Sequence, residues 1–123
     1  MKQSTPRRRR ILIVEDNEDA GETLRLVLES LGHEVQLARD GESAVAAAAT
    51  FRPSVVLMDI GLPGMNGYEA ARKIRAASLG RKVLIVALTG WSQAADLEQS
   101  HAAGIDRHLT KPVDFEALKR ILG

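Results

Sequence analysis

Short aliphatic segments alternate with amphipathic segments along most of the chain. The aliphatic segments are ILIV (11–14), EVQLA (34–38), SVVLM (54–58), VLIVAL (83–88) and HLT (108–110). Most of them are apolar throughout and do not alternate with polar positions, which is typical of parallel strands covered by helices on both faces. We therefore predict five buried parallel strands.

A helix is predicted after each strand. The first helix carries one apolar stripe and ends before Gly32, which stands where a left-handed residue would close it. The stripe consists of Ala20, Leu24, Val27, Leu28 and Leu31. Residues 43–51, 67–77, 94–103 and 115–122 have the pattern of four further helices.

The last two predicted helices differ in how firmly their patterns attach them to the sheet. The fifth begins after Asp114, a favourable N-cap residue, and we expect it to direct four apolar side chains inward. These are Phe115, Leu118, Ile121 and Leu122. The fourth offers few apolar side chains, chiefly Leu97, so we expect it to be weakly held.

Five strand–helix repeats predict the α/β class, with a doubly wound five-stranded parallel sheet flanked by five helices. In sheets of this kind the binding site lies outside the carboxyl ends of the strands, near the point where the strand order reverses. The residues that end the strands are therefore the first candidates for chemistry.

Composition limits the classes of protein to consider. The 123 residues suffice for one domain, and 45% hydrophobic with 27% charged residues is typical of a globular protein. The chain has no cysteine, which excludes disulfides, thiolate catalysis and cysteine-based metal sites. No apolar run is long enough for a membrane span or a signal peptide, so we expect a cytoplasmic protein without a membrane partner.

Charge is distributed unevenly. The net charge is +1, but Lys2 and the run Arg7–Arg10 are basic, whereas residues 11–123 hold 12 basic and 16 acidic residues. We interpret residues 1–8 as a flexible basic tail or linker and residues 9–123 as the domain. Contact of the tail with nucleic acid or another partner is the alternative, while the acidic excess of residues 11–123 argues against nucleic-acid binding through the domain itself.

Polar residues follow four of the predicted strands. They are Glu15 and Asp16 after the first, Asp59 after the third, Thr89 after the fourth and Lys111 after the fifth. Three carboxylates that share one crevice repel one another unless a cation lies among them. Oxygen ligands favour Mg²⁺, which proteins commonly hold through one or two carboxylates and a phosphate oxygen. We therefore expect a magnesium site.

The same residues suit phosphoryl chemistry. Lys111 supplies a positive charge and Thr89 a hydroxyl donor for phosphoryl oxygens. Asp59 stands singly after a central strand and is the best nucleophile, while the glycine-rich segment after it lets the carbonyl of Gly61 approach a ligand. Each residue alone is also a common loop residue at a strand end. Five suitable residues at four strand ends favour the functional interpretation.

With these residues the sequence resembles the receiver domain of two-component response regulators, from about Arg9 to Leu122. The similar motifs are ILIVEDN (11–17), VVLMDIGLPGMNG (55–67), ALTG (87–90) and LTKPVD (109–114). The resemblance implies the CheY-like, flavodoxin-like fold with strand order 2-1-3-4-5. In that strand order the first and third strands are neighbours.

The resemblance also implies a role for each site residue. Mg²⁺ would be bound by Glu15, Asp16, Asp59 and the backbone carbonyl of Gly61. Asp59 would accept a phosphoryl group from a phosphohistidine of a histidine kinase or histidine phosphotransfer protein. Thr89 and Lys111 would contact the phosphoryl oxygens, and the Lys111–Pro112 peptide bond would be cis.

Two positions depart from the familiar pattern of the family. His108 stands where an aromatic switch residue is common, and it is either a substitute switch or a partly exposed residue without a role. Trp91, two residues after Thr89, either shields the phosphoryl group or packs on the surface. The other histidines, His33 and His101, are expected to be ordinary surface residues.

Three functions fit the sequence to different degrees. The first is a phosphoacceptor that changes the surface of helix 4, strand 5 and helix 5 and so regulates a downstream domain or protein. The second is a degenerate receiver that serves only for docking. The third, a phosphatase or mutase, would need a second acid two residues after Asp59, where Gly61 stands, so we do not expect an enzyme. The domain could work alone or belong to a hybrid kinase.

Overall fold

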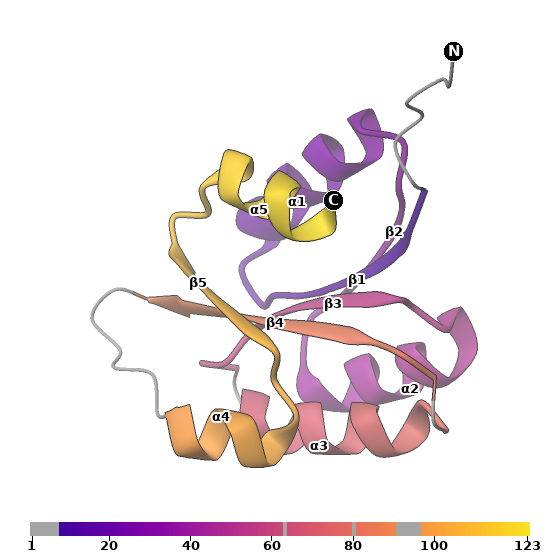
Figure 1. Ribbon diagram of the computed structural model, residues 1–123, viewed down its shortest axis with the longest axis vertical. Coiled ribbons are helices and arrows are strands. Elements are labelled where there is room, and N and C mark those ends of the chain that lie inside the picture. The colour runs from indigo at the N-terminus through magenta and orange to yellow at the C-terminus, as the bar shows by residue number, and fades with distance from the viewer. Residues whose placement is uncertain (1–7, 63, 80, 91–96) are drawn as a thin grey trace.

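The computed structural model describes residues 8–62, 64–79, 81–90 and 97–123. A single parallel sheet has the strand order β2-β1-β3-β4-β5, as predicted. The strands are β1 (Arg10–Val14), β2 (Glu34–Ala38), β3 (Val55–Asp59), β4 (Leu84–Gly90) and β5 (Arg107–Lys111). Figure 1 shows α1 and α5 on one face of the sheet and α2, α3 and α4 on the other. The predicted doubly wound fold is confirmed.

The helices follow the predicted segments closely. They are α1 (Glu18–Ser30), α2 (Gly41–Phe51), α3 (Gly67–Ala77), α4 (Leu97–Ala103) and α5 (Phe115–Leu122). Gly32 has φ +96°, which confirms the left-handed residue that ends α1. Residues 94–96 of the predicted fourth helix lie outside the described residues. In the described part of the chain, no helix is long and apolar enough to cross a membrane.

Each strand is apolar throughout because its two faces contribute to two different cores. Ile11 and Ile13 pack with α1 and α5, whereas Leu12 and Val14 pack with α2 and α3. The same alternation holds in β3 and β4. Burial of each such side chain contributes roughly 1.5–3 kcal/mol relative to leaving it exposed. The sheet is therefore a rigid base for the residues at its carboxyl edge.

Phe115 corrects one prediction. Leu118 and Leu122 are buried as expected and Ile121 is partly buried, but Phe115 is 37% exposed. It is the first residue of α5 and lies beyond the apolar core. Three strands also extend further than predicted, so that Asp59, Thr89 and Lys111 belong to the strands and do not follow them.

Arg9 and Arg10, the first two residues of the predicted domain, bond to the ends of two helices. The Arg9 Nε donates to the carbonyl of Leu122 at 2.8 Å, and the Arg10 Nε donates to the carbonyl of Phe51 at 2.8 Å. Both carbonyls lie at helix C-termini, where backbone acceptors lack helical partners. These two arginines of the basic run are therefore anchored to the domain. The backbone N–H of Arg9 also donates to Nδ1 of His33 at 3.1 Å, so His33 is not an ordinary surface residue.

Candidate functional site

Strand pairing brings the predicted site residues to one edge of the sheet. β3 lies between β1 and β4, and Asp59 is the last residue of β3. Thr89 pairs with Thr110, and Gly90 pairs with Lys111 across β4 and β5. The carboxyl ends of parallel strands share one edge, so side chains distant in sequence converge there.

Three carboxylates meet at this edge. One oxygen from each of Glu15, Asp16 and Asp59 lies within 4.8 Å of the other two. The side chains of Glu15 and Asp59 are only 1% and 10% exposed, whereas Asp16 is exposed. Two acids are thus held in a buried position while the third faces solvent. Buried carboxylates at this spacing need a positive charge to balance them.

The ammonium group of Lys111 supplies that charge in this structure. Its Nζ is 2.7 Å from Oδ2 of Asp59 and 3.0 Å from Oε1 of Glu15. The Lys111–Pro112 peptide bond is cis, as the resemblance implied. Burial by itself lowers the pKa of Lys111, but the hydrogen bonds to the two carboxylates outweigh it and the pKa is raised. Lys111 is therefore a firmly charged partner for both acids.

Backbone N–H groups complete the surroundings of the two buried acids. The N–H of Asn17 donates to Oε2 of Glu15 at 3.2 Å, and the N–H of Gly61 donates to Oδ1 of Asp59 at 2.8 Å. Burial raises the pKa of Glu15, the bonds from Lys111 and Asn17 partly offset the rise, and the charge of Asp59 adds to it. Burial is thus the largest influence on Glu15 and disfavours its charged form, which Lys111 and the N–H of Asn17 stabilise in part.

The chemistry of these ligands suits a hard divalent cation. Within the described residues, the group consists of carboxylate oxygens alone, with no histidine or thiolate to favour zinc. Asp16 leaves the crevice open to solvent, as a cation that keeps several waters requires. The residues present therefore fit Mg²⁺, and Glu15, Asp16 and Asp59 are the ones that could hold it.

Gly67 fixes the loop that follows Asp59. A Cβ atom at Gly67 would lie 2.5 Å from Cα of Ile60, closer than any real contact. The N–H of Gly67 also donates to the carbonyl of Ile60 at 3.2 Å. The first turn of α3 thus packs directly on the backbone next to Asp59, and only glycine permits this approach.

The remaining predicted residues have different positions. Thr89 is 5% exposed near the end of β4. Nε2 of His108 is 2.8 Å from Oγ of Ser100, a buried residue of α4. Trp91 lies outside the described residues. The contact between His108 and α4 was not predicted, because a lone serine in a helix gives no signal of its partner.

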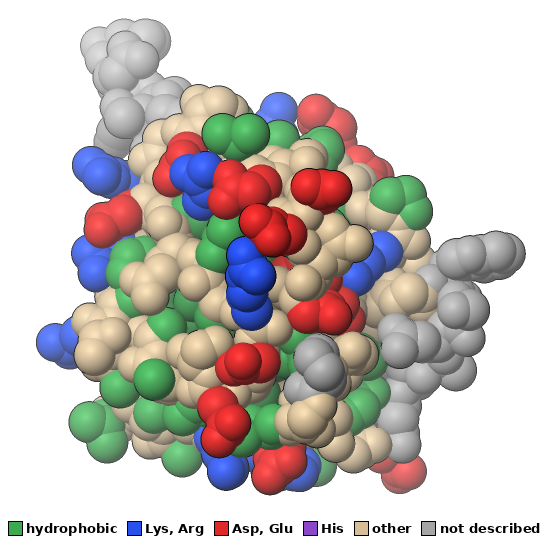
Figure 2. All heavy atoms as spheres, turned by 180° about the vertical axis from the view of Figure 1, so that it is seen from behind, with side chains coloured by type: hydrophobic (Ala, Val, Ile, Leu, Met, Phe, Trp, Pro, Cys, Tyr) green, Lys and Arg blue, Asp and Glu red, His purple; other side chains and the backbone are tan. Residues whose placement is uncertain are grey.

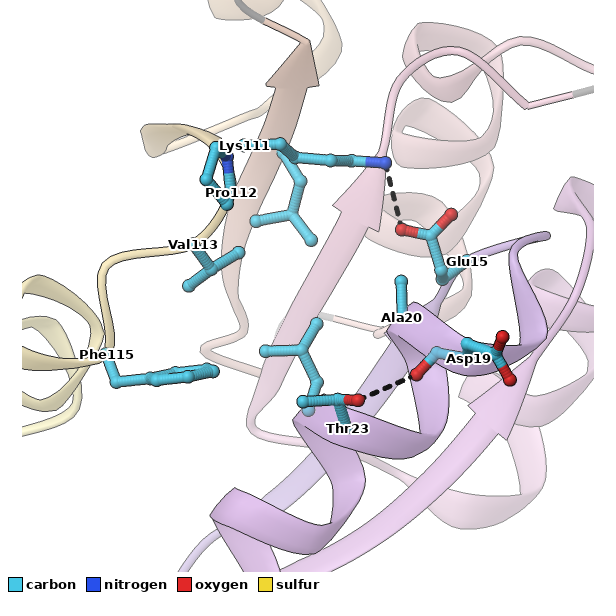
Figure 3. A pocket seen from close by; sticks show the side chains of 10 residues that line it. Glu15, Asp19, Ala20, Thr23, Lys111, Pro112, Val113 and Phe115 are labelled. Carbon is cyan, nitrogen blue, oxygen red and sulfur yellow. Dashed lines mark hydrogen bonds and ion pairs between the residues drawn. The ribbon is translucent and has the colours of Figure 1, made fainter.

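An apolar cavity of about 330 Å³ adjoins the site. Asp19, Ala20 and Thr23 of α1 line one side of it, while Lys111 and Phe115 line the other (Figure 3). The dashed line that starts at Lys111 in Figure 3 marks its ion pair with Glu15. This arrangement explains the exposure of Phe115, whose ring forms part of the cavity wall. Sequence reasoning missed the cavity because it depends on how α1 and α5 pack against each other.

Comparison with known proteins identifies the family. Residues 11–123 match the response regulator receiver domain. The chain belongs to this family. It is 37% identical to protein PilH of Pseudomonas aeruginosa over 113 residues, which cover 92% of this chain and 93% of PilH. It is also 37% identical to the virulence sensor protein BvgS of Bordetella bronchiseptica, but spans only 10% of that protein.

Solved receiver structures agree with the fold. The receiver domain of sensor histidine kinase PA1611 from Pseudomonas aeruginosa is 41% identical with a TM-score of 0.82, covering 94% of this chain and 95% of that one. In that structure a magnesium ion is coordinated in the active site cleft. The receiver domain of Saccharomyces cerevisiae Ssk1, solved with the histidine phosphotransfer protein Ypd1, is 29% identical with a TM-score of 0.83, covering 98% and 89%.

Membership of the family defines the class of activity. A receiver domain accepts a phosphoryl group in two-component signalling and does not turn over an outside substrate. Receiver domains pair with histidine kinases or histidine phosphotransfer proteins. The predictions of the family, the fold and the phosphoacceptor class are confirmed.

Proposed function

We propose that Asp59 is the phosphoacceptor and that its phosphorylation depends on Mg²⁺. One observation carries the proposal. Glu15, Asp16 and Asp59 converge within 4.8 Å while Nζ of Lys111 lies 2.7 Å from Asp59. Asp59 is the acid of this group that ends a central strand and faces the crevice, whereas Glu15 is almost fully buried. Asp59 thus combines a position at the end of a central strand with the bond to Lys111, which Asp16 lacks among the described residues, so we assign the acceptor role to Asp59.

Glu15, Asp16, Asp59 and the carbonyl of Gly61 would hold the metal ion. When bound, Mg²⁺ neutralises charge on the phosphoryl oxygens and on the crowded acids. The side chain of Asp16 is exposed, so its substitution removes no buried contact. We therefore expect such a substitution to weaken metal binding and to leave the fold unchanged. The magnesium ion of the PA1611 receiver domain supports the same assignment here.

The transfer step conserves atoms and charge in a simple way. A carboxylate oxygen of Asp59 forms a new O–P bond, and the P–N bond of the donor phosphohistidine breaks. Its electron pair returns to the imidazole ring, which takes up a proton from solvent. Lys111 stays close to the reacting oxygens because its strand position fixes its backbone, and its ammonium group moves from the carboxylates to the new phosphoryl oxygens.

Thr89, Lys111 and His108 connect the phosphoryl group to the surface. The Thr89 hydroxyl would donate to a phosphoryl oxygen from the end of β4. His108 follows on β5 and holds Ser100 of α4 at 2.8 Å. Movement of Thr89 toward the phosphoryl group would change the packing between β4 and β5 and so the position of α4. The output is a changed α4–β5–α5 surface that a downstream domain or protein recognises.

The donor would be a histidine kinase or a histidine phosphotransfer protein in the cytoplasm. The structure of Ssk1 with Ypd1 supports the second class of donor, and the length of BvgS supports a hybrid kinase as one setting for the domain. The site residues do not distinguish one donor protein from another, because all histidine kinases and histidine phosphotransfer proteins present the same phosphohistidine.

Incubation with acetyl phosphate tests the proposal without a partner protein. We expect intact mass to show one added phosphoryl group in the presence of Mg²⁺ and none in EDTA. The Asp59→Asn variant should remain unlabelled, while Asp19→Asn, a control at an exposed acid on α1, should be labelled normally. Labelling of Asp59→Asn would move the site. No labelling of the parent chain would favour the docking function.

A further inference from the structure

A second surface lies at the amino ends of the strands, opposite the acidic cleft. Two residues there have a left-handed backbone although they are not glycine, namely Arg52 with φ 55° and Leu79 with φ 52°. Both line one hollow of about 350 Å³, together with Arg81 and two alanines of α2 and α3. Arg52 is the C-cap of α2 and Leu79 follows Ser78, the C-cap of α3, so the left-handed backbone ends a helix at each position. Both side chains are exposed and border the same hollow.

Leu79 is the most exposed large apolar side chain of the described residues. It is 88% exposed, compared with 59% for Leu26 and 37% for Phe115. Arg81 and Lys82 follow it closely in sequence, and Arg52 lies across the hollow. We refer to Arg52, Leu79, Arg81 and Lys82 as the Leu79 patch. It combines one protruding apolar side chain with three cations.

The cations of the Leu79 patch differ from other arginines of the domain in their ion pairs. Arg9 and Arg10 donate to helix carbonyls, and Arg75 binds Asp106 at 2.9 Å. In contrast, among the described residues Arg52, Arg81 and Lys82 form no ion pair with a carboxylate. Asp106 lines a neighbouring hollow together with Lys82, and its carboxylate already accepts from Arg75 and from the N–H of Ile85. The patch therefore presents uncompensated positive charge.

We propose that the Leu79 patch binds the surface of a bilayer that contains anionic phospholipid. A headgroup phosphate would lie in the hollow between the guanidinium groups of Arg52 and Arg81, which suit bidentate binding of phosphate. Leu79 would enter the acyl boundary, and Lys82 would add to the attraction. This inference goes beyond the phosphoacceptor function and departs from our sequence-based expectation of no membrane partner.

The alternative polyanion, nucleic acid, fits the patch less well. The hollow is lined by alanines, arginines and a leucine, and it offers no aromatic ring for stacking on bases. α2 and α3 end at this edge, so their C-terminal turns and not a recognition helix face the ligand. An exposed leucine between cations suits the boundary of headgroups and acyl chains. Leu79 thus distinguishes a lipid surface from a nucleic acid.

The position of the patch leaves the phosphoacceptor site accessible. Figure 1 shows the strands running from their amino ends on the right to their carboxyl ends on the left. Figure 2, viewed from behind, shows lysine and arginine side chains along the left margin, at the amino ends, and acidic side chains gathered nearer the centre and right. A domain bound to a bilayer through the patch would direct the acidic cleft away from the lipid.

Vesicle flotation tests the proposal with the full chain. The probes are vesicles of phosphatidylcholine alone and vesicles of phosphatidylcholine mixed with phosphatidylglycerol. We expect binding only to the mixed vesicles, with loss of binding as salt is raised. Arg81→Gln with Lys82→Gln should weaken binding about fivefold per lost cation. Leu79→Gly should weaken it about tenfold, and it should fold normally because glycine suits φ 52°.

Two matched variants control for charge and for loss of a leucine. Arg72→Gln with Lys73→Gln removes two adjacent exposed cations from the middle of α3, and Leu26→Ser removes an exposed leucine from α1. Both should bind like the parent chain. The proposal is overturned if the parent ignores mixed vesicles, or if patch and control variants bind alike, which would assign binding to the basic tail. The parent chain could instead bind duplex DNA and no vesicles, with binding that depends on Arg81 and Lys82 but not on Leu79. That result would identify nucleic acid, and not lipid, as the ligand of the patch.

Discussion

The two edges of the sheet carry opposite charges for the same reason. At the carboxyl edge the helices begin, and the side chains of Asn17, Asp40, Asn66 and Asp114 accept hydrogen bonds from their first N–H groups. At the amino edge the helices end, and Arg9 and Arg10 donate to the last carbonyls of α5 and α2. Acids and amides thus suit one edge and cations the other, as the helix dipole requires.

Some charged side chains at each edge neither cap a helix nor bond to a helix carbonyl, and these are the candidates for a functional role. At the carboxyl edge Glu15, Asp16 and Asp59 cap no helix, and the structure balances the two buried acids with Lys111 alone. At the amino edge Arg52 and Arg81 likewise bind no carboxylate among the described residues. The three acids converge on one cleft, and the two arginines border one hollow. The comparison predicts that variants at the carboxyl edge respond to Mg²⁺ and those at the amino edge do not.

The largest expected effect is at Lys111. Lys111→Met would leave two buried carboxylates without a cation, and the free energy of unfolding should fall by about 3 kcal/mol in EDTA, at the low end of the range because the ammonium is partly exposed. Mg²⁺ should restore much of the loss because it takes over the neutralisation. Urea unfolding with and without Mg²⁺ measures both values. Equal stability in the two conditions would contradict the shared-cation account.

Gly67→Ala should come next. The new Cβ would collide with Cα of Ile60, and overpacking against backbone should cost about 2 kcal/mol. The displaced loop should also slow phosphorylation of Asp59 by acetyl phosphate. Gly41→Ala is the control, because the nearest atoms to its Cβ would be side-chain atoms of Met65 at 3.0 Å, and none of them belongs to the backbone. A Gly67→Ala chain as stable as Gly41→Ala would show that this approach is not needed.

A smaller effect is expected for Arg75 at the amino edge. Its guanidinium donates to the carbonyls of Val83 and Gly104 and binds Asp106. Arg75→Met should lower the free energy of unfolding by about 1.5 kcal/mol, with no rescue by Mg²⁺ and with normal phosphorylation. Arg72→Met, at an exposed position of the same helix, should be neutral in the same urea titration. Rescue of Arg75→Met by Mg²⁺ would break the distinction between the edges.

The smallest effect is the pH dependence from His33. Burial, with the nearby charge of Arg9, lowers the pKa of His33 below 6.5. Below 6.5 the unfolded chain therefore binds more protons than the folded one, and stability should rise with pH until about 6.5 and then stay constant. His33→Gln can still accept from the N–H of Arg9 and should flatten the rise. A rise that persists in His33→Gln would assign it to another group.

Much of the fold followed from the sequence because the relevant signals are local. The strand β2 and the helices α3 and α5 have the predicted bounds, since apolar runs and capping residues such as Asn66 and Asp114 define them. Strand order came from the resemblance and not from the apolar pattern, which gives no information on which strands are neighbours. The prediction that Phe115 points inward was wrong, because the apolar stripe of a helix does not show where along the helix the core ends.

The site was predictable in composition but not in its contacts. Residues at strand ends identify Glu15, Asp59 and Lys111, because the topology of a parallel sheet places strand ends together. The sequence did not show that Lys111 bonds to both acids, since that depends on distances across three strands. It also gave no signal for Arg9 as a partner of α5, because Leu122 lies at the other end of the chain.

A calorimetric titration of Mg²⁺ tests the central claim most directly. The account predicts one magnesium ion per parent chain and an affinity at least about tenfold lower for Asp16→Asn, a substitution at an exposed residue that leaves stability unchanged. Asp19→Asn, outside the group of three carboxylates, should bind Mg²⁺ like the parent chain. Equal affinity in the parent and in Asp16→Asn, or no saturable binding in the parent, would contradict the claim that the three carboxylates share a cation.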